Sequence, residues 1–201
     1  MRLILTVIIT VILIILVLNL HPASREFFAK FFPNQKSNTS NVNVMTNKIV
    51  FSLNASYEDL IIIGNSNLTI SSGNILLKTS VGDIETNRSV DILGFVGEAQ
   101  VHKKDLDLSG SFKEIRFGET KITSNGNIDS GTPFSNLVIS GNGFLNLTGN
   151  GTIFSEKKSL SASFSGENVI IEGFAGMIKL GENMEISGSA SDVKIVKEVI
   201  L

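Results

Sequence analysis

The sequence predicts an all-β domain displayed outside the cytoplasm and carried by one N-terminal transmembrane α-helix. Three observations predict this class. An uncharged apolar run opens the chain, apolar residues alternate with other residues after Lys48, and two stretches of the later region repeat one pattern. We therefore divide the chain into a transmembrane segment (1–21), a juxtamembrane segment with a linker (22–47) and a β domain (48–201).

The amino-acid composition argues against several classes of function. The chain has 201 residues, a formal net charge of -2 and no cysteine. The small charge and the lack of a basic run with interleaved aromatics argue against a nucleic-acid partner. Without cysteine there are no disulfides, thiolate nucleophiles or thiolate metal sites. Abundant Gly, Asn and Ser with few Pro are typical of strands joined by tight turns.

The opening apolar run is long enough to be a membrane anchor. Residues 3–20 carry no charge, and at ~1.5 Å per residue they span about 27 Å, close to the hydrocarbon thickness of about 30 Å. The alternative is a cleaved secretory signal, but the run is longer than such a core, and His21 stands where a small residue favours cleavage after Ala23. Either reading exports the rest of the chain. We expect a single-pass cell-membrane protein with its C-terminal domain extracytoplasmic.

An aromatic segment follows the anchor. Phe27, Phe28, Phe31 and Phe32 share one helical face opposite the charges, a pattern suited to the headgroup boundary of a lipid bilayer. The alternative is that these side chains pack against the β domain. Pro33 ends the segment, and residues 34–47 are polar and small, as expected of a linker.

The β domain is predicted from alternation with period two. Such runs recur along the chain, for example Ile49-Phe51-Leu53, Leu68-Ile70 and Leu106-Leu108, with weaker signals at Ile122 and Ile128. Turns are expected where residues tolerate positive φ, at Gly64-Asn65, Ser72-Gly73-Asn74, Gly82-Asp83 and Ser109-Gly110. This spacing predicts a new strand about every eight residues.

Two stretches of the β domain repeat one another. Val90, Ile92, Gly94, Phe95 and Gly97 recur in order as Val169, Ile171, Gly173, Phe174 and Gly176. Leu108-Ser109-Gly110-Ser111 recurs as Ile186-Ser187-Gly188-Ser189, and Leu60–Asn65 recurs as Leu137–Asn142. We infer an internal duplication with units of about 59–118 and 135–197. Phe95 and Phe174 are expected at equivalent core positions where backbones approach closely.

Two architectures fit this pattern equally at the level of alternation. One is an elongated β-solenoid of stacked rungs. The other is an antiparallel fold resembling a β-sandwich or jelly roll. Both bury one face of each strand, so alternation does not separate them.

The residues able to catalyse a reaction or bind a metal do not form a recognisable site motif in the sequence. His21 and His102 are the only histidines, which leaves no material for a catalytic triad or a histidine zinc site. Asp105-Asp107 and Glu182-Glu185 are read as solvated strand faces, and Gly141-Asn142-Gly143 and Gly149-Asn150-Gly151 as turns. We predict no catalytic, metal-binding or cofactor-binding residue, and therefore a protein that is not an enzyme.

The remaining site prediction concerns glycosylation. Candidate acceptors are the Asn-x-Ser/Thr sequons, which become meaningful in a cell that glycosylates exported proteins; they are Asn38, Asn54, Asn67, Asn87, Asn146 and Asn150.

A short anchor followed by repeated strands resembles, as an architecture, the bitopic component of the lipopolysaccharide-export bridge. That resemblance implies lipid or hydrophobic-ligand transfer along an open β fold. The Val-x-Ile-x-Gly-Phe-x-Gly pattern at 90–97 and 169–176 is similar in style to bactofilins, which implies a self-assembling scaffold. The leading expectation is a non-enzymatic structural or binding module of the cell envelope. Its expected partners are the bilayer, other envelope proteins or further copies of itself.

Overall fold

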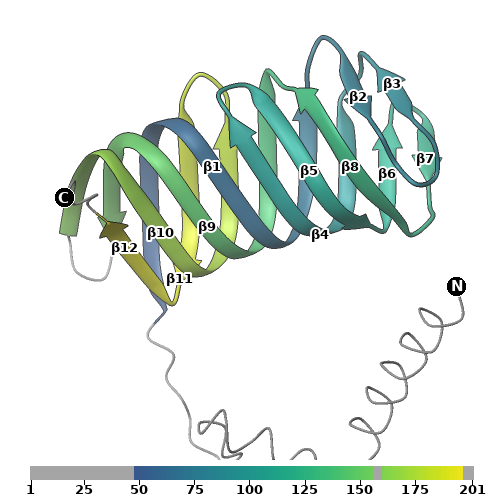
Figure 1. The fold of residues 1–201 in the computed structure, drawn as a ribbon. Coiled ribbons are helices and arrows are strands. Elements are labelled where there is room, and N and C mark those ends of the chain that lie inside the picture. Colours follow the sequence, from purple (N-terminus) through teal and green to yellow (C-terminus); the bar gives the residue numbers. More distant parts are fainter. Residues whose placement is uncertain (1–47, 156–159, 197–201) are drawn as a thin grey trace, which may run out of the picture. The chain divides into compact units, whose positions relative to one another are not determined.

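The computed structural model describes residues 48–155 and 160–196, which belong to one compact unit. The described part is built of strands without helices, which confirms the all-β prediction (Figure 1). Its strands are β1 (Ile49–Ser71), β2 (Ile75–Leu77), β3 (Ile84–Thr86), β4 (Val90–His102), β5 (Asp105–Phe112), β6 (Glu114–Phe117), β7 (Thr120–Ile122), β8 (Gly126–Pro133), β9 (Asn136–Ser155), β10 (Leu160–Leu180), β11 (Met184–Ala190) and β12 (Asp192–Val196).

The predicted anchor, the Phe27–Phe32 segment and the linker lie outside the described residues. Within residues 48–155 and 160–196, no helix has the length and hydropathy needed to cross a membrane.

One large sheet carries most of the fold. Its order is β11-β10-β9-β1-β4-β5-β8, while β6 and β12 pair with β4 and β10, and β7 pairs with β6. β11 also pairs with the first half of β1, so β1, β9, β10 and β11 close into a ring. Every strand pairing in the described residues is antiparallel. The antiparallel pairing expected of the second architecture is therefore observed, and the parallel stacking of solenoid rungs is not found in the described residues.

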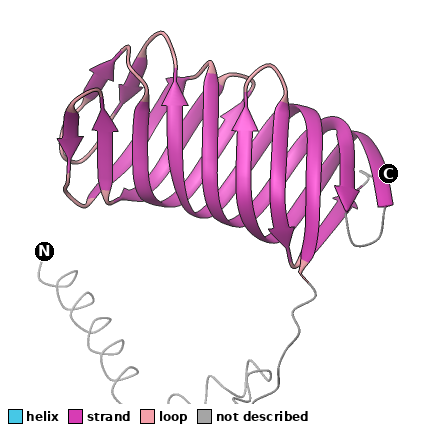
Figure 2. Ribbon diagram, turned by 180° about the vertical axis from the view of Figure 1, so that it is seen from behind, coloured by secondary structure: helices cyan, strands magenta, loops and turns pink. Residues whose placement is uncertain are grey.

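The long strands cross from one layer of the fold to the other (Figure 2). In β1, Leu60 and Ile62 are buried before the bend and Leu68 and Ile70 are buried after it. The buried residues keep the same parity, so one face of the sheet stays inside on both arms. The sheet thus folds over a single apolar core.

A row of glycines lies at this bend. Gly110, Gly97, Gly64 and Gly143 stand opposite one another across β5, β4, β1 and β9. A Cβ on Gly97 would overlap the carbonyl oxygen of Ser109 and come within 2.7 Å of the Cα of Gly110. Only a residue without a side chain allows the strands to approach this closely.

A second row repeats the arrangement on the other half. Gly188, Gly176 and Gly141 face one another across β11, β10 and β9, and a Cβ on Gly176 would overlap the carbonyl oxygen of Ser187. Except for Gly143, both rows consist of glycines from the repeated sequence pattern. The repeated glycines are therefore the residues that let the sheet fold.

The strand pairings of residues 59–117 match those of residues 136–196. β4 pairs with β5 and β6 as β10 pairs with β11 and β12. β1 and β9 pair with each other in antiparallel register, with Asn65 opposite Asn142 at the midpoint of the matching segments. The two halves are thus arranged about a local two-fold axis near this asparagine pair.

Phe95 and Phe174 occupy equivalent places in the core, with exposed fractions of 1% and 2%. Before each, a glycine bulges out of the strand, at Gly94 with φ 62° and at Gly173 with φ 60°. The carbonyl preceding each bulge accepts a hydrogen bond from the segment after β5 or β11, from Lys113 N–H at 3.0 Å and Ser191 N–H at 2.9 Å. The predicted burial of both phenylalanines is confirmed.

Several predicted turns are wrong. Gly64-Asn65, Ser109-Gly110, Gly141–Gly143 and Gly149–Gly151 lie inside strands, whereas Ser72–Asn74 and Gly82-Asp83 do connect strands. The physical reason is that glycine serves both a turn with positive φ and a bend where backbones touch. The expected strand every eight residues is wrong for the same reason, since β1 alone has 23 residues.

Candidate functional site

The candidate site is the outer face of the sheet over β9, β1, β4, β5 and β8, here called the outer face. Outward side chains form continuous rows across these strands because opposite residues point to the same side. One row runs Asn146, Ile61, Gln100, Asp107 and Gly131, and the next runs Phe144, Ile63, Glu98, Ser109 and Asp129. The face therefore changes from apolar over β9 and β1 to acidic and polar over β4, β5 and β8.

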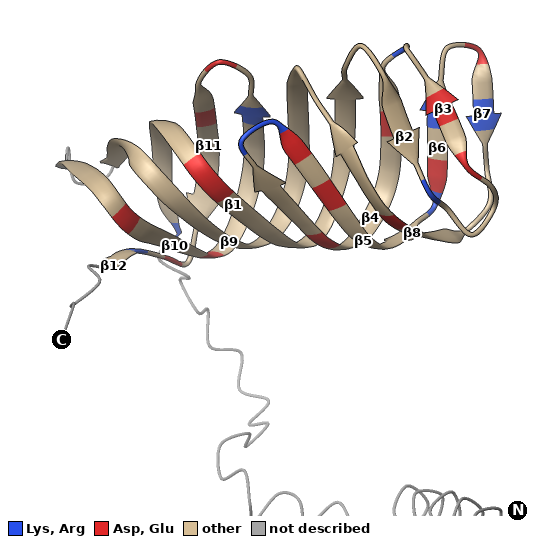
Figure 3. Ribbon diagram, turned by 45° about the horizontal axis from the view of Figure 1, so that its top comes forward, with Lys and Arg blue, Asp and Glu red and all other residues tan. Residues whose placement is uncertain are grey.

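A groove of about 720 Å³, here called the acidic groove, occupies the polar half of the outer face. Figure 3 shows acidic bands on β5 in this region. The groove is lined by residues of β4, β5, β8 and the segment at β2: Leu76, Lys78, Glu98, Gln100, Asp107, Leu108, Ser109, Asp129, Ser130 and Gly131.

The segment at β2 forms one wall of the groove because it hydrogen-bonds along β8. Ser130 Oγ donates to the Leu76 carbonyl at 2.9 Å, and Asp129 N–H donates to the Lys78 carbonyl at 3.2 Å. At the floor, a side chain at Gly131 would come within 2.6 Å of the Asp107 carboxylate. The glycine therefore leaves room for Asp107 in the groove.

The acidic groove carries more negative than positive charge. Three carboxylates, of Glu98, Asp107 and Asp129, line it together with one cation, Lys78. The ion pairs found among the described residues involve the carboxylates of Asp59, Glu114, Glu172 and Asp192, and none involves the three carboxylates of the groove. This excess of negative charge favours cationic groups in a ligand.

The matching half of the fold has a counterpart groove with different chemistry. It is smaller, about 180 Å³, and is lined by residues of β1, β10 and β11: Ser52, Asn54, Met177, Lys179, Glu185, Ile186 and Ser187. By the matching pairings, Met177 stands where Glu98 stands and Lys179 where Gln100 stands. Lys179 lies opposite Glu185, so the counterpart groove has one cation and one carboxylate, whereas Lys78 in the acidic groove is accompanied by three carboxylates.

An apolar patch borders the acidic groove. Ile63 and Phe144 lie opposite each other on β1 and β9 and are 46% and 37% exposed. Ile61 and Ile170 flank Asn146 on its two sides and are half-buried. The Oδ1 atom of Asn146 is buried without a hydrogen-bond partner in the described residues. These five residues, here called the apolar patch, combine exposed hydrocarbon with an unsatisfied acceptor.

The predicted glycosylation residues fall in different environments. Asn54, Asn67, Asn87 and Asn150 are exposed, Asn146 is half-buried, and Asn38 lies outside the described residues. Asn67 Oδ1 accepts from Gly94 N–H at 2.8 Å and Asn150 Oδ1 accepts from Gly166 N–H at 2.9 Å, so both amides are engaged. Asn87 lies on the connection between β3 and β4.

Other ionisable residues form structural contacts. His102 Nδ1 lies 2.6 Å from Asp59 Oδ1 on the exposed side of β4 and β1. Tyr57 donates its hydroxyl to the Lys103 carbonyl at 2.7 Å, and burial raises the pKa of its phenol. Within the described residues, no group of three or more His, Asp or Glu side chains is placed to hold a metal ion.

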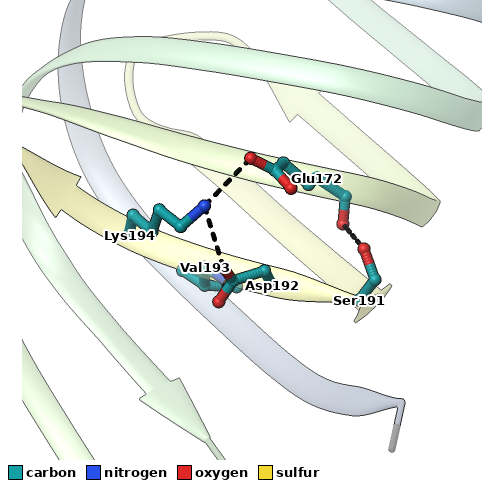
Figure 4. A network of polar contacts seen from close by, with 5 residues as sticks. All are labelled: Glu172, Ser191, Asp192, Val193 and Lys194. Atoms are coloured by element: carbon teal, nitrogen blue, oxygen red, sulfur yellow. Dashed lines mark hydrogen bonds and ion pairs between the residues drawn. The ribbon is translucent and has the colours of Figure 1, made fainter. Parts of the chain in front are cut away.

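A polar network fastens β12 to β10 (Figure 4). Lys194 Nζ lies 3.0 Å from both the Glu172 and Asp192 carboxylates, and Ser191 Oγ donates to the Glu172 carbonyl at 2.8 Å. The hydrogen bond from Lys194 lowers the pKa of Asp192, and hydrogen bonds to Asp192 and Glu172 raise the pKa of Lys194. This network holds a strand in place and lies apart from the acidic groove.

Reasoning from the sequence missed the acidic groove. From the sequence, Asp107 is predicted only to lie on a solvated strand face, and no role is predicted for Glu98, Gln100 or Asp129. The outward spacing of Glu98-Gln100 and Asp107-Ser109 was a usable signal, but it required the pairing of β4 with β5. Comparison of the chain with protein-family models, with curated proteins and with solved structures gives no match.

Proposed function

We propose that this chain is a membrane-anchored, non-enzymatic module of the cell envelope that binds a partner through its outer face. The apolar run at 3–20 supports the anchor and the export of the β domain. The absence of cysteine and the presence of only two histidines support a role without covalent or metal catalysis.

The observation that carries the proposal is the acidic groove beside the apolar patch. A concave surface with convergent polar groups and adjacent apolar side chains is the usual form of a binding site. The interior of the fold offers less space for a ligand, because the side chains of Phe95 and Phe174 are nearly fully buried in the core. Packing thus favours ligand binding on the outer face over transfer of a hydrophobic ligand along the inside.

We also propose that the domain arose by internal duplication of a unit of about 59–118 and 135–197. Support comes from the matching pairings, the two glycine rows and the equivalent Gly-Phe bulges. Convergence on a β-rich composition does not account for equivalent residues at equivalent points of one sheet.

Protease treatment of intact cells tests the location. A tag at the C-terminus should be cleaved off when protease is added to intact cells, or to cells whose outer membrane has been permeabilised so that protease reaches the periplasm. Protection of the tag under both conditions, with a cytoplasmic marker equally protected, contradicts an extracytoplasmic domain.

Site-specific photocrosslinking in living cells tests the binding role. A photoreactive residue at Gln100 lies in the acidic groove, and the same residue at Lys179 lies in the counterpart groove and serves as the matched control. We expect discrete adducts from position 100 and few from position 179. Equal yields at the two positions, or none at position 100, refute the outer face as the binding surface.

A further inference from the structure

We infer that the outer face docks a partner protein segment that is apolar along its centre and carries lysine or arginine beside that centre. This inference rests on the proposed binding function and specifies the chemistry of the partner. It draws on two independent features of the face: exposed hydrocarbon and carboxylates without an ion-pair partner.

The apolar patch supplies the hydrocarbon contact. Ile63 and Phe144 are cross-strand neighbours and leave 46% and 37% of their surface in water. Ile61 and Ile170 extend the patch on either side of Asn146. Large side chains gathered on one face of a sheet are a common mark of a protein contact.

The acidic groove specifies the charge. Glu98 lies directly opposite Ile63, so the boundary between the patch and the groove is one strand wide. Glu98, Asp107 and Asp129 have no ion-pair partner in the described part of the chain. A cation placed next to the apolar centre of the partner therefore meets unpaired carboxylates as soon as that centre covers the patch.

The charge of the face selects a basic segment over other occupants. A second copy docked through the same face would bring the same three carboxylates, whereas the acidic groove favours cations. An anionic lipid surface is disfavoured by the three carboxylates. A single strand or helical turn with flanking cations fits both the patch and its acidic border.

Fluorescence anisotropy with labelled synthetic peptides tests the inference. The full-length chain in zwitterionic nanodiscs is titrated against a decapeptide with a Leu/Phe centre and two Lys at each end, with empty nanodiscs as the background. Two further probes replace the Lys residues by Glu or the apolar centre by Ser. We expect the Lys-flanked apolar peptide to bind at least tenfold more tightly than either of them.

Two matched pairs of variants locate the binding. Ile63→Ser and Phe144→Ser should each weaken binding at least fivefold, whereas Val50→Ser and Phe154→Ser, at residues with similar exposure on the same strands, should leave it unchanged. Glu98→Gln should weaken only the Lys-flanked peptide. Equal affinity for Lys-flanked and Glu-flanked peptides, or equal effects of the two serine pairs, overturns the inference. If crosslinks form at position 100 but the peptides bind without selectivity, the proposed binding function is supported and the inferred basic, apolar partner segment is refuted.

Discussion

Replacing Gly97 by alanine should unfold the domain more readily than any exposed substitution, because this position sets the closest approach of β4 and β5. The new Cβ would come within 2.3 Å of the Ser109 carbonyl oxygen and 2.7 Å of Gly110 Cα, whereas ordinary contact begins at 3.4 Å. The two strands must therefore move apart at this point. Such a shift stretches the ladder hydrogen bonds beside Gly97, each worth about 0.5–1.5 kcal/mol.

The size of the effect follows from these terms. Overpacking of this kind costs about 1–3 kcal/mol, and two weakened hydrogen bonds bring the total to about 2–4 kcal/mol. The lower entropy of the unfolded chain returns about 0.4–1 kcal/mol. Gly73→Ala gives the control, because nothing lies within 4 Å of a Cβ there and the same entropy gain applies.

Urea unfolding of the full-length chain in mild detergent, followed by circular dichroism in the β region, measures both variants. We expect Gly97→Ala to lower the free energy of unfolding by about 2–4 kcal/mol relative to Gly73→Ala, with unchanged m-values. A difference below about 1 kcal/mol would refute the argument that the glycine row permits the bend.

Three further predictions concern the core, the β12 network and the surface. Phe95→Ala and Phe174→Ala should each cost about 3–5 kcal/mol in the same unfolding assay, and a loss below about 1 kcal/mol contradicts a core role. Lys194→Met should accelerate amide hydrogen exchange in β12 without affecting β5. The pKa of the Asp192 carboxyl is lower in the folded than in the unfolded chain. The ionised carboxylate therefore stabilises the fold above the unfolded pKa, and this contribution is lost as the pH falls through the folded pKa. In that acidic range, the amides of wild-type β12 should exchange faster, after correction for intrinsic exchange. In a host that glycosylates exported proteins, Asn87 should carry a glycan, so the mass of the glycosylated protein should fall on Asn87→Gln. An unchanged mass contradicts this assignment.

The sequence was a good guide to what the core requires and a poor guide to where the chain turns. Alternation predicted the inward faces, and the repeated Gly-Phe pattern placed Phe95 and Phe174 in the core. Gly64-Asn65 has the composition of a hairpin turn, yet it lies inside β1. The deciding factor is the neighbouring Gly143 across the strand pair, a contact between distant residues that local sequence does not contain.

The candidate site was harder to predict because it depends on pairing. Glu98 and Asp129 are far apart in sequence and appear as separate exposed carboxylates. They share a groove only because Ser109 of β5 stands between them in register. The anchor and the aromatic segment rest on the sequence alone, since both lie outside the described residues.

The two halves of the domain differ most where scaffold requirements are weakest. Gly97 and Gly176 are identical because each must let two backbones touch. Glu98 and Met177 occupy matching outward positions and share neither charge nor polarity. Since the fold tolerates either residue there, the carboxylate of Glu98 is not required for folding. Its position beside the apolar patch agrees with the partner proposed above, so we expect selection for binding to act on the first groove and not on the second.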